Sequence, residues 1–95
     1  MLTVERLLDL DVIADPVSRK SIVLRLRKGL AMSIPYDPSS RPHVVNIVTR
    51  SLDYPGGLAE LIEAVKLYAD PTDPDLLQAE ETAHRLEQET GQENG

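Results

Sequence analysis

The sequence contains no cysteine, phenylalanine or tryptophan, and only three tyrosines among its 95 residues. Without cysteine the chain cannot form a disulfide or a thiolate metal site, and it has no cysteine nucleophile. This composition suits a reducing compartment, so we expect a cytoplasmic protein. Because large aromatic side chains are almost absent, leucine, isoleucine, valine and alanine must build the core of the one domain that a chain of this length allows.

Long apolar runs are also absent. None of them approaches the roughly 18 residues that a membrane-spanning helix needs. The start of the chain, MLTVE, lacks the basic segment and the long apolar stretch of a secretory signal. The sequence therefore predicts no membrane segment, no signal peptide and no membrane partner.

Bases are scarce at both ends of the chain, and acids are scarce in its middle. Residues 17–50 contain seven bases and one acid, whereas residues 52–95 contain eleven acids and two bases. The first sixteen residues contain four acids and one base. A molecule with this pattern can attract copies of itself head to tail, or a partner of the opposite pattern. The same charges can also pair within one chain, and the sequence leaves both alternatives open.

Apolar residues at helical spacing predict about five helices. The first occupies residues 3–10. The second starts at Asp15 and Pro16, because a carboxylate can cap a helix and proline suits the first helical position, and it extends to about Ile34. Gly29 weakens this second segment and marks either a bend or a division into two short helices.

A loop at residues 35–42 holds three prolines and two serines, which prevent a continuous helix. The third helix follows Pro42. Its predicted inward residues are Val44, Val45, Ile47, Val48 and Leu52. A strand over residues 43–48, HVVNIV, is the alternative, but the apolar spacing through Leu52 and the proline start favour a helix.

The stretch YPGG at residues 54–57 predicts a type II turn, which needs a positive φ at its third residue. Its two glycines could receive an anion or form a tight corner between two helices, and the corner is favoured because no nucleotide-binding pattern surrounds them. The fourth helix starts at Gly57, and one face of it carries Leu58, Leu61, Ile62, Val65 and Tyr68. A fifth segment starts at Asp73-Pro74 with a thin apolar stripe of Leu76, Leu77, Ala83 and Leu86. We expect the chain to fray from Gly91.

No catalytic or metal-binding pattern is present in the sequence. It lacks the glycine-rich dinucleotide fingerprint and the phosphate-loop motif. Its two histidines, His43 and His84, are far apart in the chain and have no metal-ligand spacing. No serine stands in a nucleophile elbow, and the many carboxylates serve solubility more often than acid–base chemistry. We therefore expect no enzyme, no catalytic residue, no cofactor and no bound metal.

The segment RKSIVLRLRKG, residues 19–29, could bind nucleic acid. The chain is acidic overall, however, and has no aromatic side chains beside these bases on which nucleotides could stack. A nucleic-acid-binding helical regulator that uses this basic second helix is therefore the alternative function. Arg19 lies near the apolar stripe of the helix, so it either forms an ion pair with an acid of a loop or the tail, or contacts a partner.

Two stretches, DPVSRKSIVLRL (residues 15–26) and RPHVVNIVTRSLDYPGGLAELIEAV (residues 41–65), resemble the effector-associated domain family of bacterial conflict systems, especially its second type, which is frequent in actinobacteria. The matching residues are Asp15, Pro16, Ser18, Arg19, Leu26, Ile34, Arg41, Val44, Val45, Asn46, Val48, Leu52, Pro55, Gly56, Gly57, Leu58, Leu61 and Ala64. The resemblance covers residues 2–69 and leaves out the tail from Asp70. His43 stands where the family usually has Asp, and Ser51 stands where it often has Cys or a small residue.

The resemblance implies an all-α fold: a small, death-fold-like bundle of about five helices, with the adaptor domain at residues 1–69 and an acidic C-terminal helix or linker at residues 70–95. Such domains are non-catalytic adaptors fused to peptidase, nucleotidase, TIR or NTPase modules, and a matching copy elsewhere is thought to recruit the effector by like-with-like contact. We expect a protein partner that carries a similar domain, or a second copy of this chain, and no nucleic acid. The predicted partner-binding residues are a basic face of Arg19, Arg25, Arg27, Lys28 and Arg50, and an acidic face of Asp53, Glu60 and Glu63.

Overall fold

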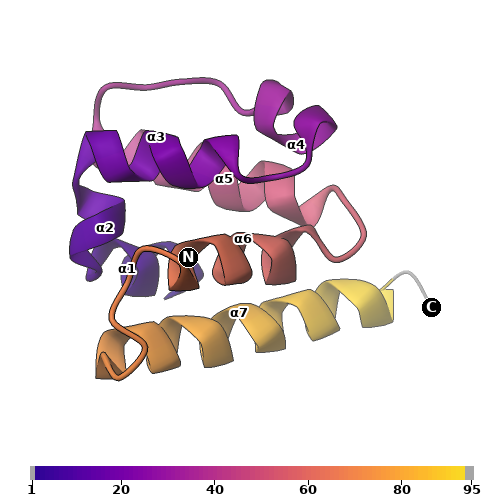
Figure 1. Ribbon diagram of the computed structural model, residues 1–95. Coiled ribbons are helices and arrows are strands. Elements are labelled where there is room, and N and C mark those ends of the chain that lie inside the picture. Colours follow the sequence, from indigo (N-terminus) through magenta and orange to yellow (C-terminus); the bar gives the residue numbers. More distant parts are fainter. Residues whose placement is uncertain (1, 94–95) are drawn as a thin grey trace.

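The computed structural model describes residues 2–93, and it describes the side chains of residues 2–89. The regular elements in this part of the chain are all helices: α1 (Leu2–Leu8), α2 (Asp11–Ala14), α3 (Pro16–Leu24), α4 (Lys28–Ser33), α5 (Ser40–Leu52), α6 (Gly57–Lys66) and α7 (Pro74–Glu93). The predicted all-α bundle is confirmed, with five helices of seven residues or more and two shorter ones (Figure 1). The alternative strand at residues 43–48 is wrong, because this segment lies inside α5.

Helix α2 is a single helical turn that the sequence did not predict. Ile13 in this turn and Leu10 just before it are both buried in the core. A short connection can therefore bury two large apolar side chains. Immediately after it, the Asp15 carboxylate accepts a hydrogen bond of 2.9 Å from the backbone N–H of Ser18 and caps α3, as the sequence predicted.

Of the two alternatives that the sequence left open for residues 16–34, the division into two short helices is the one observed, as α3 and α4. Helix α3 ends at Leu24, and Arg27 has an extended backbone with φ −52° and ψ 146°. The carboxylate of Glu60 accepts hydrogen bonds from the backbone N–H and from Nε of Arg27, which holds the open connection in place. Gly29 lies inside α4, so the division comes before the glycine and not at it.

Helix α5 starts at Ser40, three residues before the predicted start after Pro42. Proline is tolerated in this first turn because the first N–H groups of a helix have no partner within the helix. Val44, Ile47 and Val48 are buried as predicted, whereas Val45 is 40% exposed. Neighbouring helical residues point about 100° apart, so Val44 and Val45 cannot both face the core fully.

Helix α6 contributes Leu58, Leu61, Ile62 and Val65 to the core, as predicted. Tyr68 was expected on the same face, but α6 ends at Lys66 and the tyrosine is exposed. Helix α7 buries Leu76, Ala79 and Ala83, which stand at i, i+3 and i+7, whereas Leu77 is exposed. Helix α7 extends to Glu93, past Gly91 from which we expected the chain to fray, and residues 94 and 95 lie outside the described part.

Helix α7 lies along one side of the molecule and packs against α1 and α6 (Figure 1). Helix α3 contacts α6 from another side, so α6 stands between α3 and α7 (Figure 1). Leu76, Ala79 and Ala83 of α7 belong to the same buried cluster as the apolar residues of α1, α5 and α6. The acidic segment from residue 70, which we expected to be a C-terminal helix or linker beside the adaptor domain, contains a helix that packs on the bundle.

Candidate protein-interaction surface

The glycine pair forms a tight corner between α5 and α6. Gly57 N–H donates a hydrogen bond of 2.9 Å to the carbonyl of Tyr54, and Gly56 has φ 70°, as a type II turn requires. A Cβ atom at Gly57 would collide with the backbone carbonyl of Ser51 in the preceding helix. The second glycine therefore lets two helices meet at close range, and the first supplies the positive φ of the turn.

The start of α6 is also an anion site, but the anion belongs to the chain itself. Glu87 of α7 accepts hydrogen bonds from the backbone N–H groups of Leu58 (3.2 Å) and Ala59 (3.4 Å). A carboxylate at this position satisfies N–H groups that have no helical partner and interacts favourably with the helix dipole. The contact therefore ties α7 to the corner and fills the position that an external anion would take.

Arg19, which we predicted to contact a partner, is fully buried. Its Nη1 donates hydrogen bonds to the carbonyls of Ile13 (2.8 Å) and Ala14 (3.3 Å) and to the hydroxyl of Ser40 (3.1 Å). Its Nε donates to Nδ1 of His43 at 2.8 Å. The alternative prediction of an ion pair with an acid is also wrong, because a histidine and carbonyl oxygens take the acid's place. Arg19 therefore joins α2, α3 and α5 and does not belong to a surface.

His43 must be neutral to accept a hydrogen bond at Nδ1, so its proton resides on Nε2. Its side chain is buried, and the Tyr36 ring meets it edge-on at a centroid distance of 5.2 Å. Burial lowers the pKa of His43 below its ordinary value of 6.5, the Arg19 charge lowers it further, and the Asp37 carboxylate opposes them. The ring therefore remains an acceptor for Arg19 at neutral pH.

Arg27 and Glu60, which we assigned to the contacting faces of two copies, pair with each other inside one chain. Arg27 Nε lies 2.7 Å from Glu60 Oε1, and its Nη2 donates a hydrogen bond of 2.9 Å to the carbonyl of Pro55. The pKa of Glu60 is lowered because the Arg27 backbone N–H and then its side chain donate to the carboxylate. These two residues hold the α3–α4 connection against the corner, so neither is a free charge.

Three other predicted residues keep only weak partners. Arg50 lies 3.8 Å from Asp53, and both side chains are about half exposed. The carboxylate of Glu63 lies 3.5 Å from Lys66, and its side chain is 73% exposed. Exposed pairs of this kind contribute about 0–1 kcal/mol and can exchange for contacts with a partner.

Exposed cations gather on α3 and at the start of α4. Arg25 donates a hydrogen bond of 3.1 Å from Nε to the hydroxyl of Tyr68, and its guanidinium lies 5.7 Å from the centre of that ring. Lys20 and Lys28 are exposed. Within the described residues none of these three cations forms an ion pair.

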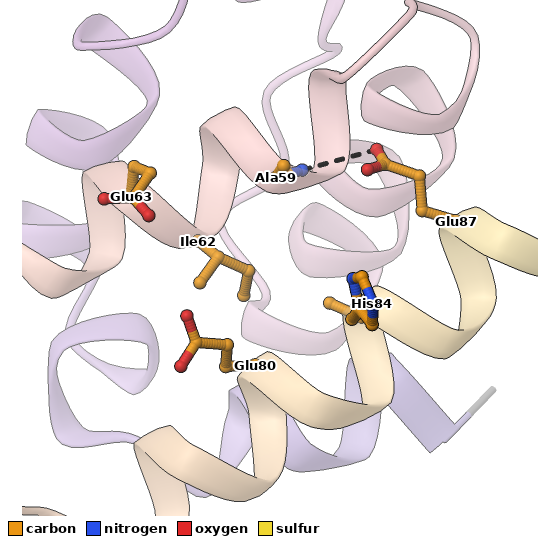
Figure 2. A pocket seen from close by; sticks show the side chains of 7 residues that line it. Ala59, Ile62, Glu63, Glu80, His84 and Glu87 are labelled. Atoms are coloured by element: carbon orange, nitrogen blue, oxygen red, sulfur yellow. Dashed lines mark hydrogen bonds between the residues drawn. The ribbon is translucent and has the colours of Figure 1, made fainter.

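A hollow of about 90 Å³, which we call the α6–α7 groove, lies between the helices that name it (Figure 2). It is lined by Ala59, Ile62, Glu63, Glu80, Ala83, His84 and Glu87. Ile62 and Ala83 are buried and form an apolar floor, whereas carboxylates of both helices stand at the rim. Small-molecule sites usually measure about 300–1,000 Å³, so the groove admits a single protruding side chain more readily than a separate ligand.

No direct signal in the sequence identified the contacts of three residues described above. His43 is 24 positions from Arg19, Glu87 is 29 positions from Leu58, and Tyr68 lies beyond the end of its helix. Pairs so distant in sequence follow from the packing of helices and not from local pattern. In the described part of the chain, no group of three histidines or acids could hold a metal ion, and no helix is long and apolar enough to cross a membrane.

Comparison with known proteins assigns the chain to a family. A family model described as effector-associated domain 2 matches residues 4–84, which extends the resemblance beyond residue 69, where we expected it to end. No curated protein and no solved structure matched the chain, so the likeness to the death fold stays a prediction. With the capped start of α3, the glycine corner and most of the helical bundle inside the matched range, the chain belongs to the effector-associated domain 2 family.

Proposed function

We propose that this chain is a non-catalytic adaptor that recruits an effector, through contact with a second copy or with a sister effector-associated domain, in a bacterial conflict, immunity or signalling system of the cytoplasm. The observation that carries the proposal is membership of a family that accompanies effectors. The distribution of charge supports it, because unpaired cations lie on α3 and α4 while acids line α6 and α7. Complementary charged surfaces guide protein association and select partners.

The direct test is a calorimetric titration of the purified chain with a protein from the same genome that carries another effector-associated domain. We expect saturable binding that weakens when Arg25 is changed to Glu. Arg27→Glu is a poorer probe than Arg25→Glu, because it also breaks the internal pair with Glu60. The proposal fails if neither a sister domain nor the chain itself binds.

The alternative function, nucleic-acid binding by the basic second helix, has lost two of the bases on which it relied. Arg19 is buried, and Arg27 is paired with Glu60. A fluorescence titration with a short DNA duplex over a series of salt concentrations separates the two functions. Binding through phosphates must fall steeply as salt rises, because each neutralised phosphate releases a counterion. Tight, steeply salt-dependent binding of the duplex would favour the alternative.

A further inference from the structure

Two of the most exposed aliphatic side chains of the molecule stand on the outer side of α3. Val17 is 73% exposed and Leu24 is 72% exposed. With Lys20 they occupy positions i, i+3 and i+7, which share one face of a helix. Arg25 follows at the C-terminal end of the helix. We call Val17, Lys20, Leu24 and Arg25 the α3 edge.

The α3 edge carries a positive charge that is already oriented. Arg25 is held by the hydrogen bond to the Tyr68 hydroxyl and by its position over that ring. Leu24, Arg25 and Tyr68 together line an open depression at this end of α3. An apolar side chain beside a fixed cation is suited to a partner surface that is apolar at its centre and acidic at its margin.

The α6–α7 groove has that composition. Two of its lining residues, Ile62 and Ala83, are buried and apolar. Its other lining residues include carboxylates of both helices: Glu63 of α6, and Glu80 and Glu87 of α7 (Figure 2). Lys66 is in close contact with Glu80, whereas it lies 3.5 Å from Glu63. Glu63 is therefore the rim carboxylate that is most open to an incoming cation.

The two surfaces cannot meet within one molecule. The α3 edge is exposed to solvent, and none of its residues lines the groove. Helix α6 separates α3 from α7 (Figure 1). A contact between the edge and the groove must therefore join two molecules.

We propose that the α3 edge of one copy docks in the α6–α7 groove of a second copy. Leu24 covers Ile62 and Ala83, and the cations Lys20 and Arg25 face Glu63 and its neighbours at the rim. This inference rests on the proposed function and names the surfaces that perform it. Because the two surfaces differ, the contact is heterologous, and each bound copy still presents one free edge or one free groove. Association therefore continues beyond a dimer.

The test uses two variants of the full chain that each block one surface. Leu24→Asp/Arg25→Glu reverses the α3 edge. Ala59→Arg/Glu63→Lys fills and reverses the groove at exposed positions. Met32→Asp/Arg85→Glu is the control, because both residues are exposed, neither belongs to the α3 edge or lines the groove, and the pair changes the net charge by the same amount as the edge variant.

Sedimentation velocity over concentrations up to about 1 mM measures the association. We expect the unaltered chain and the control to form species larger than a dimer, and each blocked variant to lose about tenfold or more in affinity. An equimolar mixture of the two blocked variants must restore association but stop at a one-to-one dimer, since only one intact edge and one intact groove remain. The inference is overturned if the blocked variants associate like the unaltered chain, or if their mixture stays monomeric.

The same variants separate this inference from the proposed function. If the unaltered chain binds a sister domain while it stays monomeric, or while both blocked variants bind that domain unchanged, the assigned surfaces are wrong and the adaptor function stands. If the unaltered chain binds neither itself nor the sister domain, both proposals are overturned.

Discussion

At the scale of single residues, the buried guanidinium of Arg19 is the contact on which the N-terminal half of the bundle depends. It is fully buried, yet no carboxylate is among its hydrogen-bond partners, which are carbonyl oxygens, a hydroxyl and the neutral ring of His43. Its Nη2 has no hydrogen-bond partner within the described residues. Burying a cation without a full set of hydrogen-bond partners costs folding free energy. The residue that accepts the Arg19 Nε hydrogen bond, His43, therefore has a large influence on stability.

The free energy of unfolding should fall as pH is lowered from about 7.5 to 5.5. The pKa of His43 is lowered in the folded state, so below its ordinary value of 6.5 the unfolded chain binds the proton more tightly and is favoured. Glu5, Asp15, Glu60 and Asp70 also have lowered pKa values, but they start from 4.5 or less and act at lower pH. Urea unfolding at a series of pH values measures the effect.

The control for this prediction is His43→Asn, which keeps an acceptor near the position of Nδ1 and does not titrate. Its free energy of unfolding should be nearly constant over the same pH range. An equal pH dependence in the variant and the unaltered chain would show that His43 is not responsible.

A carboxylate at position 43 should stabilise the chain. The resembled family usually has Asp there, and in this structure the position faces the Arg19 guanidinium at the start of α5. Asp and Asn have the same shape, so His43→Asp compared with His43→Asn isolates the charge. We expect the Asp variant to be more stable at neutral pH by about 1.5–3 kcal/mol, the range for hydrogen bonds to charged groups. Equal urea midpoints for the two variants would contradict this account of Arg19.

At the scale of helices and turns, the corner at Gly56 and Gly57 decides how α5 and α6 meet. Gly57→Ala should lower the free energy of unfolding by about 2–4 kcal/mol, because its Cβ collides with a backbone carbonyl that cannot move aside. Gly29→Ala is the matched control. A Cβ there meets only Tyr54 at 3.6 Å, and alanine favours a helix, so this change should raise stability by up to about 1 kcal/mol. Thermal unfolding of both variants measures the difference in stability. Equal unfolding temperatures for the two variants would contradict this account of the corner.

Helix α7 should be needed for folding, because it packs against α1 and α6 and shares their core. A chain that ends at residue 69 loses Leu76, Ala79 and Ala83 and uncovers the apolar residues beneath them. We expect that chain to lose cooperative unfolding in circular dichroism, whereas a chain that ends at residue 89 keeps it. Cooperative unfolding of the 1–69 chain at the original temperature would show that the bundle is complete without α7.

Helix starts and turns were largely predictable from the sequence, because they depend on residues that are adjacent in the chain. Asp15 and Pro16 marked the start of α3, and the YPGG stretch marked the corner, since each depends on neighbouring residues alone. A division between α3 and α4 was one of the alternatives at Gly29, but its place before the glycine was not predictable, because it is held by Glu60, which is 33 positions from Arg27. Likewise, the position of Arg19 on a stripe with Ile22 and Leu26 indicates burial, but nothing near it in the sequence identifies His43 as its partner.

At the scale of the whole molecule, the uneven charge of the sequence is only partly available to a partner. Arg27 and Glu60 neutralise each other, and Arg41 pairs with Glu5, whose pKa is lowered by that contact. Of the charges that stay exposed, Lys20, Arg25 and Lys28 lie along α3 and at the start of α4, whereas Glu63, Glu80 and Glu87 line the α6–α7 groove. The sequence predicted the opposite charges of two surfaces, whereas folding decided which residues form them.

The claim that the exterior of this bundle is its functional part is tested most directly by nuclear magnetic resonance. The isotope-labelled chain is titrated with an unlabelled protein that carries a second effector-associated domain, and the shift of each backbone amide is followed. We predict saturable shifts confined to the α3 edge and to the residues that line the α6–α7 groove. The account is contradicted if the partner shifts no amide, or if the shifted amides surround the buried Arg19–His43 contact and leave both surfaces unchanged.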